Sequence, residues 1–125
     1  MQEEAVKSPV VWLDVPCTDL DRVITFYSAV LACEVPKETF GDFSMGILPH
    51  GGDAIGGCLA VMSDNSPSDH GMLIYLNCDG RLEDAVAQVE SNGGTVKNPL
   101  HTIGPHGQRA IILDSEGNRV ALHSS

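Results

Sequence analysis

The stretch that decides the fold is Val10–Leu31, VVWLDVPCTDLDRVITFYSAVL. Its first part alternates between two kinds of side chain, which is the period of a strand with one buried face. One set is aliphatic and is expected to face a core: Val11, Leu13 and Val15. Trp12 and Asp14 then lie on the opposite face of the same strand.

The rest of the stretch predicts a helix. Thr18 followed by Asp21 resembles a capping box at the helix start. Apolar residues then recur at helical spacing: Leu20, Val23, Ile24, Tyr27 and Leu31. The stretch is therefore a strand followed by a helix with one apolar stripe toward a core.

The remainder of the chain repeats this order. Strand-like runs at 33–40, 43–49 and 54–62 complete a first βαβββ module, and a strand at 71–78, a helix over 81–94 and strands at 95–103, 108–114 and 118–124 form a second. We predict an α+β fold in a single domain over 1–125, with module one at about 8–63 and module two at about 70–125. Side by side, the modules would form a cupped eight-stranded mixed sheet with helices on the outer face, and its concave surface suits a small ligand.

Composition narrows the possible partners. The 125 residues carry a net charge of −10, which argues against nucleic acid and against anionic membrane surfaces because both are bound by cations. No apolar run approaches the roughly 20 residues that span a bilayer, and the acidic N-terminus lacks a signal peptide, so a cytoplasmic protein is expected. The four cysteines contain no CxxC pair and are expected to be reduced, buried residues.

Three segments carry a resemblance to a known family: TDLDRVITFYSAVL, NGGTV and above all DSEGNRVALH. They resemble the glyoxalase, bleomycin-resistance and extradiol-dioxygenase superfamily, also called vicinal oxygen chelate proteins, and the resemblance extends from Val10 to His123. It implies paired βαβββ modules around a cupped sheet, commonly in a homodimer. In metal-using members it also implies a divalent ion, held by His or Glu, that polarises two substrate oxygens.

The resemblance places Trp12 and Ala121 where metal-using relatives often have His and Glu. Neither side chain can bind a metal. We therefore expect no metal at the usual family site and no confident cofactor, with a divalent ion in an atypical ligand set as the disfavoured alternative.

Alternation along the strands also selects candidate site residues. Asp14 beside Trp12 would suit proton transfer or a cationic ligand group, although it could equally pair with Arg109 or Arg119 as a structural residue. His123 could act as an acid or base, or could simply be solvated near the chain end. The predicted site thus has Asp14 and His123 as catalytic residues and, as substrate-binding residues, Trp12, Tyr75, Asn77, Ala121 and His106.

Three functions remain open. The first is a protein or metal-free enzyme that binds a small organic molecule in the cup, for which the net charge of −10 would favour a cationic guest. The second is a lyase or isomerase that uses Ni, Zn, Mn or Fe through His101, His106 or His123. The third is a non-catalytic dimeric module.

Overall fold

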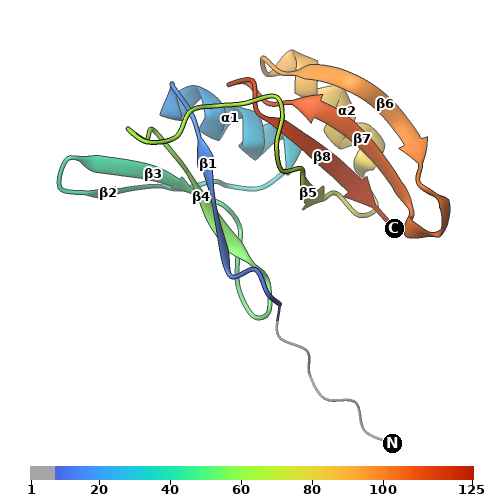
Figure 1. The fold of residues 1–125 in the computed structure, drawn as a ribbon, viewed down its shortest axis with the longest axis horizontal. Coiled ribbons are helices and arrows are strands. Elements are labelled where there is room, and N and C mark those ends of the chain that lie inside the picture. Colours follow the sequence, from blue (N-terminus) through green and yellow to red (C-terminus); the bar gives the residue numbers. More distant parts are fainter. Residues whose placement is uncertain (1–7) are drawn as a thin grey trace, which may run out of the picture.

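The structure, a computed structural model, describes residues 8–125, which form two βαβββ units in series (Figure 1). The first unit consists of β1 (Trp12–Pro16), α1 (Leu20–Val30), β2 (Lys37–Phe40), β3 (Phe43–Ile47) and β4 (Gly56–Ala60). The second consists of β5 (Ile74–Asn77), α2 (Leu82–Ser91), β6 (Thr95–Thr102), a 3₁₀ turn (Gly104–His106), β7 (Gln108–Leu113) and β8 (Arg119–Ser124). The predicted order of elements is confirmed.

Each unit forms one four-stranded mixed sheet, with strand orders β1-β4-β3-β2 and β5-β8-β7-β6. The first and last strands of each unit are parallel neighbours, and the other pairs are antiparallel. The α+β class with two βαβββ modules is therefore confirmed. No strand ladder joins the two units in residues 8–125, so the eight strands form two separate sheets. The units are joined instead by side-chain contacts and helix packing.

One core serves both units. α1 buries four side chains that are at most 1% exposed: Val23, Phe26, Tyr27 and Val30. α2 contributes Leu82, Ala85 and Val89 to the same cluster and packs against α1 and against β6, β7 and β8 (Figure 1). The two helices thus cover one side of the sheets and leave the opposite sheet faces uncovered by helix.

The turn between β7 and β8, residues 114–119, docks the second unit onto the first, and we call it the seam turn. The Tyr27 hydroxyl on α1 donates to Asp114 Oδ2 at 2.7 Å, and Asn118 Nδ2 donates to the Pro16 carbonyl at 2.8 Å. Burial, reinforced by the Asp114 charge, raises the pKa of Tyr27 well above its usual value, so its hydroxyl remains a donor. The segment DSEGNR is therefore the contact between the two units.

Glu116 extends this contact to the start of α1. Its Oε1 accepts the backbone N–H groups of Thr18 and Asp19, both at 2.8 Å, and its Oε2 accepts from Arg22 Nε at 2.7 Å. Burial raises the pKa of the Glu116 carboxyl, but the hydrogen bonds from Arg22 and from the two backbone groups outweigh this effect and hold the pKa at about 2. Glu116 is thus a charged group that the fold needs in its ionised form.

The predicted capping of α1 is wrong in one respect. The helix is capped by Asp19, whose side chain accepts from the Arg22 N–H at 3.1 Å. The Thr18 hydroxyl instead donates to Glu116 Oε1 at 3.0 Å. The capping pattern in the local sequence is overridden because an acceptor from the other unit takes the Thr18 hydroxyl.

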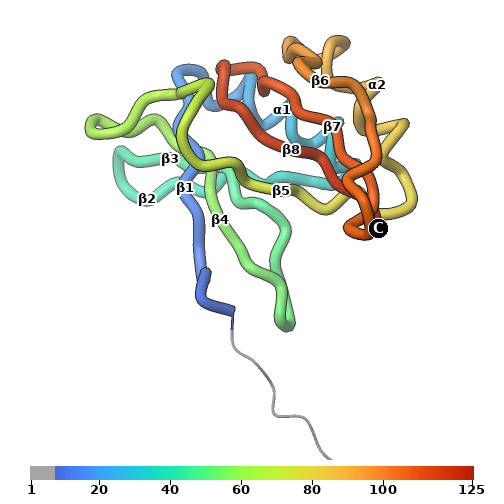
Figure 2. Tube along the Cα trace, turned by 45° about the vertical axis from the view of Figure 1, so that its right-hand side comes forward, coloured from blue at the N-terminus to red at the C-terminus, as the bar shows by residue number. Residues whose placement is uncertain are grey.

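The segment after β4 crosses to β8 before it enters β5 (Figure 2). It is fixed there because the Arg119 N–H donates to the Ser68 carbonyl at 3.1 Å and the Ser68 N–H donates to Asn118 Oδ1 at 3.2 Å. Within residues 8–125, neither helix combines the length and apolar character needed to cross a membrane.

Candidate functional site

A pocket of about 710 Å³ lies where the two units meet. Its walls come from β1, from the segment that crosses to β8, and from the first residues of β5 and β8. Apolar side chains line much of it: Val10, Trp12, Leu13, Met72, Leu73, Ile74 and Val120. The polar side chains on its wall include Asp14, His70, Asn118 and Arg119, so this is an apolar cavity with a small number of polar groups.

β1 supplies Trp12 and Asp14 to this pocket. Val15 is buried in the core, whereas Trp12 is 44% exposed and Asp14 is exposed, as the alternation predicts. The prediction is wrong for Val11, which precedes β1 and is 82% exposed, and Leu13 packs only partly on the core and also lines the pocket. The indole Nε1 of Trp12 donates to Asp14 Oδ1 at 3.1 Å. A Cβ at Gly56 would lie 2.9 Å from the Trp12 ring, so glycine on the neighbouring strand makes room for the indole.

Asp14 is held by neutral groups. The Cys58 thiol donates to the same Oδ1 at 3.3 Å, and no ion pair joins Asp14 to Arg109 or Arg119 in residues 8–125. Burial, reinforced by the Asp14 hydrogen bond, raises the pKa of Cys58 to about 11. The thiol therefore stays protonated as a donor to Asp14, in agreement with a packing role for Cys58 and not a nucleophilic one.

Arg119 lies on the same wall without a carboxylate partner. Its Nη2 donates to the Gly71 carbonyl at 3.3 Å, and its buried Nε has no hydrogen-bond partner in the part of the chain that the structure describes. The pocket therefore presents an acidic and a basic side chain that do not neutralise each other.

A second group of candidate residues lies on the uncovered face of the β5–β8 sheet. The rings of Tyr75 and His123 are 6.0 Å apart, and Arg109 from β7 donates from Nη1 to the Tyr75 hydroxyl. Tyr75 is 46% exposed while Leu76 packs on the core, so the Tyr75 side chain lies on the face of β5 that points away from the core. This group does not line the pocket beside Trp12, so the structure places the predicted site residues in two clusters.

The other predicted residues have more local surroundings. Asn77 Oδ1 accepts the Asp79 N–H at 2.9 Å and so supports the turn after β5. Ala121 is fully buried. His106 contributes its backbone carbonyl, which accepts from His123 Nε2 at 2.7 Å.

Sequence reasoning considered Arg109 only as a structural partner of Asp14 and His101 only as a possible metal ligand. His101 lies in β6, and Arg109 Nε donates to its Nε2 at 3.0 Å. The signal was present in QRAIILD, because Ala110 and Ile112 are the apolar partners of a core and Arg109 must then face the other way.

The metal that the fold family implies does not fit these residues. The Trp12 indole is a hydrogen-bond donor to Asp14, and Ala121 has no donor atom in its side chain. In residues 8–125 no group of three or more His, Cys, Asp or Glu side chains lies close enough together to hold a metal ion.

Comparison with known proteins agrees with this fold. The sequence matches the family described as Glyoxalase/Bleomycin resistance protein/Dioxygenase superfamily over residues 10–122. None of the curated proteins with which it was compared matches it.

Solved structures give the same fold at low identity. A glyoxalase/bleomycin resistance protein from Albidiferax ferrireducens T118 is 18% identical, with a TM-score of 0.72 over 94% of this chain and 99% of that one. A glyoxalase-related enzyme from Fulvimarina pelagi is 15% identical, with a TM-score of 0.68 over 93% of this chain and 87% of that one. The V278E glyoxalase I mutant from Zea mays is 16% identical, with a TM-score of 0.71, and the match covers 93% of this chain but 46% of the maize chain. The family match covers most of the sequence and the fold agrees with it, so the chain belongs to the glyoxalase/bleomycin resistance protein/dioxygenase superfamily.

Proposed function

We propose that this protein binds a small organic molecule in the pocket beside Trp12 and Asp14, without a metal ion at the usual family position. The observation that carries the proposal is the pocket itself, a cavity of about 710 Å³ whose apolar wall surrounds a few polar side chains. Small-molecule sites in proteins have this make-up and this range of volume. Met72, which is 95% exposed, lies on the same wall, and a bound ligand would cover it.

Asp14 is the proposed polar contact for the ligand. Both of its hydrogen bonds use Oδ1, and Oδ2 has no hydrogen bond in the described residues. A carboxylate held this way is fixed in direction yet keeps one oxygen for a ligand N–H or O–H, or for a proton. His123 lies outside this pocket, on the uncovered face of the β5–β8 sheet, and is proposed as an acid or base for a ligand that reaches that face. A carbonyl only accepts, so the contact with the His106 carbonyl places the proton on Nε2 and leaves Nδ1 free.

The experiment uses Trp12 as its reporter, because it is the only tryptophan in the chain. Small neutral, cationic and anionic metabolites would be screened by thermal shift, and every hit titrated by tryptophan fluorescence. A pocket ligand should change Trp12 emission, and Asp14→Asn should weaken its binding. Asp42→Asn, which alters an exposed turn on the first unit, is the matched control.

Two results would contradict this proposal. One is a screen in which no stabilising compound changes Trp12 emission and every such compound binds Asp14→Asn as tightly as it binds the unmodified chain. The other is a stoichiometric metal in protein purified without a tag or chelator, lost on His123→Ala, which would favour a metal-dependent lyase or isomerase.

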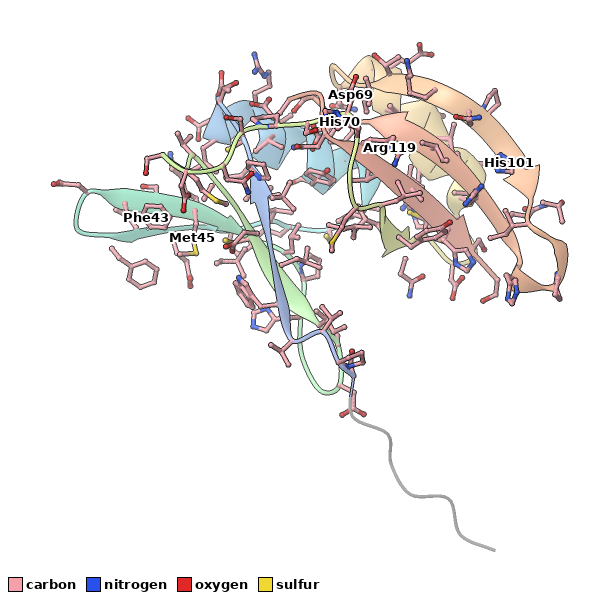
Figure 3. All side chains as sticks on the ribbon, viewed as in Figure 1. Phe43, Met45, Asp69, His70, His101 and Arg119 are labelled. Carbon is pink, nitrogen blue, oxygen red and sulfur yellow. The ribbon has the colours of Figure 1, made fainter. Side chains whose placement is uncertain are left out.

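We also propose that the protein is a homodimer, as the family resemblance implies. Two exposed apolar side chains outside the pocket support a second copy of the chain as the partner: Val11 at 82% and Phe40 at 60%. Phe43 and Met45 add further apolar surface on β3 (Figure 3). Sedimentation velocity should give twice the chain mass, and Val11→Asp should lower it; a monomer at all concentrations would refute the dimer.

A further inference from the structure

Arg109 on β7 is one of three cations on the second sheet, with Lys97 and Arg119, that have no carboxylate partner in the described residues. Arg22, Lys37 and Arg81 each form an ion pair with a carboxylate, to Glu116, Asp21 and Asp84 in turn. Arg109 forms no ion pair within residues 8–125, and its hydrogen bonds go to Tyr75 and His101. A chain with a net charge of −10 thus keeps a guanidinium away from its own carboxylates.

Strand register explains how this cluster assembles. His101 pairs with Arg109, Arg109 with His123, and His123 with Asn77, so one row crosses all four strands. Tyr75 pairs with Ala121 on β8, which lies between β5 and β7. The small Ala121 side chain lets the Tyr75 ring cross β8, so its hydroxyl meets Arg109, whose guanidinium carbon lies 5.8 Å from the ring centre.

Hydrogen-bond chemistry fixes the charge of the cluster. Arginine can only donate, so His101 Nε2 must accept and carries no proton. The other ring nitrogen, Nδ1, then carries the hydrogen and donates to the Pro99 carbonyl at 2.8 Å. His101 is therefore neutral, and the Arg109 contacts orient the guanidinium without cancelling its charge.

The terminal end of this guanidinium is still available. Nε donates to His101 and one hydrogen of Nη1 points to Tyr75, while Nη2 has no hydrogen-bond partner in the described part of the chain. The remaining Nη1 and Nη2 hydrogens form the planar fork that matches the two oxygens of a carboxylate. His101 on β6 is seen on the uncovered face of the second sheet in Figure 3.

We infer that this face binds the carboxylate of a small organic acid, with the Arg109 fork donating to its two oxygens and the Tyr75 ring contacting its organic part. The single positive charge matches a carboxylate monoanion better than a phosphate dianion. Leu73, which lines the pocket, lies just before β5, and Tyr75 is two residues further along the chain, about 7 Å away at the rise of an extended strand. The Arg109 group does not line that pocket, so the inference rests on the proposed function in one respect: a ligand of the pocket would extend past Leu73 to Tyr75 and end in a carboxylate held by Arg109.

The test uses benzoate as the probe, with benzamide as its neutral isostere, benzylamine as its cationic counterpart and phenyl phosphate as the dianion. Binding to the full chain would be followed by calorimetry and by the shifts of the His101 and His123 ring resonances. We expect benzoate to bind about tenfold or more tightly than benzamide or benzylamine, because charge-assisted hydrogen bonds would be lost in either case.

Variants assign the effect to named groups. Arg109→Met should weaken benzoate binding about tenfold or more, while Lys97→Met, which removes an exposed positive charge from β6 in the same sheet, should leave it unchanged. His101 is a positioning residue: His101→Gln keeps an acceptor for Arg109 Nε and should retain most of the affinity, whereas His101→Leu should lose it. Melting curves would show that each variant is folded.

Each remaining outcome has a defined meaning. Benzoate that fails to bind at millimolar concentration, or binds Arg109→Met as tightly as the unmodified chain, overturns the carboxylate site. Phenyl phosphate binding more tightly than benzoate overturns the assignment to carboxylates. If benzamide binds as well as benzoate and Asp14→Asn alone weakens it, the pocket stands and the carboxylate site falls. If benzoate binding depends on Arg109 but never changes Trp12 emission, the carboxylate site stands and the pocket proposal falls.

Discussion

Glu116→Gln should weaken the contact between the two βαβββ units and so lower the free energy of unfolding. The glutamine keeps the size of the side chain but loses the negative charge that Arg22 and the N-terminus of α1 surround. A pKa held at about 2, against 4.5 for a free carboxyl, corresponds to about 3 kcal/mol of stabilisation at neutral pH. The Glu116 side chain has no exposed surface, so solvent screening does not reduce this figure much.

The sign of the effect with pH follows from the direction of this shift. Because folding lowers the pKa of Glu116, its stabilisation is complete above about pH 4.5 and is lost as the pH falls toward about 2. Urea unfolding of the wild type and of Glu116→Gln should therefore differ by about 3 kcal/mol at pH 7. The difference should shrink steadily below about pH 4.5, where the wild-type carboxyl also becomes neutral.

The control is Glu38→Gln, which neutralises an exposed glutamate on β2 that has no ion pair in the described residues. It should change the free energy of unfolding by less than about 0.5 kcal/mol. A Glu116→Gln difference below about 1 kcal/mol, or one that stays constant between pH 7 and pH 3, would refute the account of Glu116 as an ionised tie between units.

Three further perturbations test the packing around the site. Gly57→Ala should lower the free energy of unfolding by about 2 kcal/mol in urea titrations, because the new Cβ would lie 2.6 Å from a backbone carbonyl of β1; an unchanged midpoint would contradict this close approach. Tyr27→Phe should cost about 1 to 2 kcal/mol by the same measurement, since Asp114 loses one donor but keeps its backbone donors, and a neutral outcome would show that the buried hydroxyl adds nothing. The Cys58 thiol, whose pKa is raised to about 11 by burial and then by Asp14, should react slowly with a disulfide reagent at pH 8; Asp14→Asn should speed the reaction, and equal rates would argue against their hydrogen bond.

Local periodicity was sufficient where one face of an element meets the core. The alternation around Trp12 and Asp14 predicted which side of β1 is buried, and the apolar stripe of α1 predicted Val23 and Tyr27 as core residues. Thr18 shows where such reasoning ends, because its hydroxyl bonds to Glu116 from the other unit. A partner so far away in sequence is set by how the units dock, which periodicity does not encode.

The same limit applies to the candidate site. Sequence alternation correctly placed Tyr75 and His123 on one face. That these two residues form a separate cluster from Trp12 and Asp14 depends on the relative placement of the two sheets, which alternation does not predict. The net charge of −10 suggested a cationic guest, whereas Arg109, a guanidinium held by neutral partners, suggests an acid. A whole-chain charge reports on solubility and steering, and the local hydrogen-bond partners of a side chain decide what it can still bind.

The seam turn gives the pocket an unusual mechanical property. Asn118 bonds to the Pro16 carbonyl, and both residues also line the cavity. Folding thereby fixes the distance between the pocket wall from the first unit and the wall from the second. A ligand would meet a preorganised cavity, and its binding would need no closure of one unit onto the other. Substitutions in the crossing segment around Met72 alone could then change the ligand specificity. A substitution that loosens the seam turn would instead reduce the affinity, because a smaller fraction of the molecules would be able to bind.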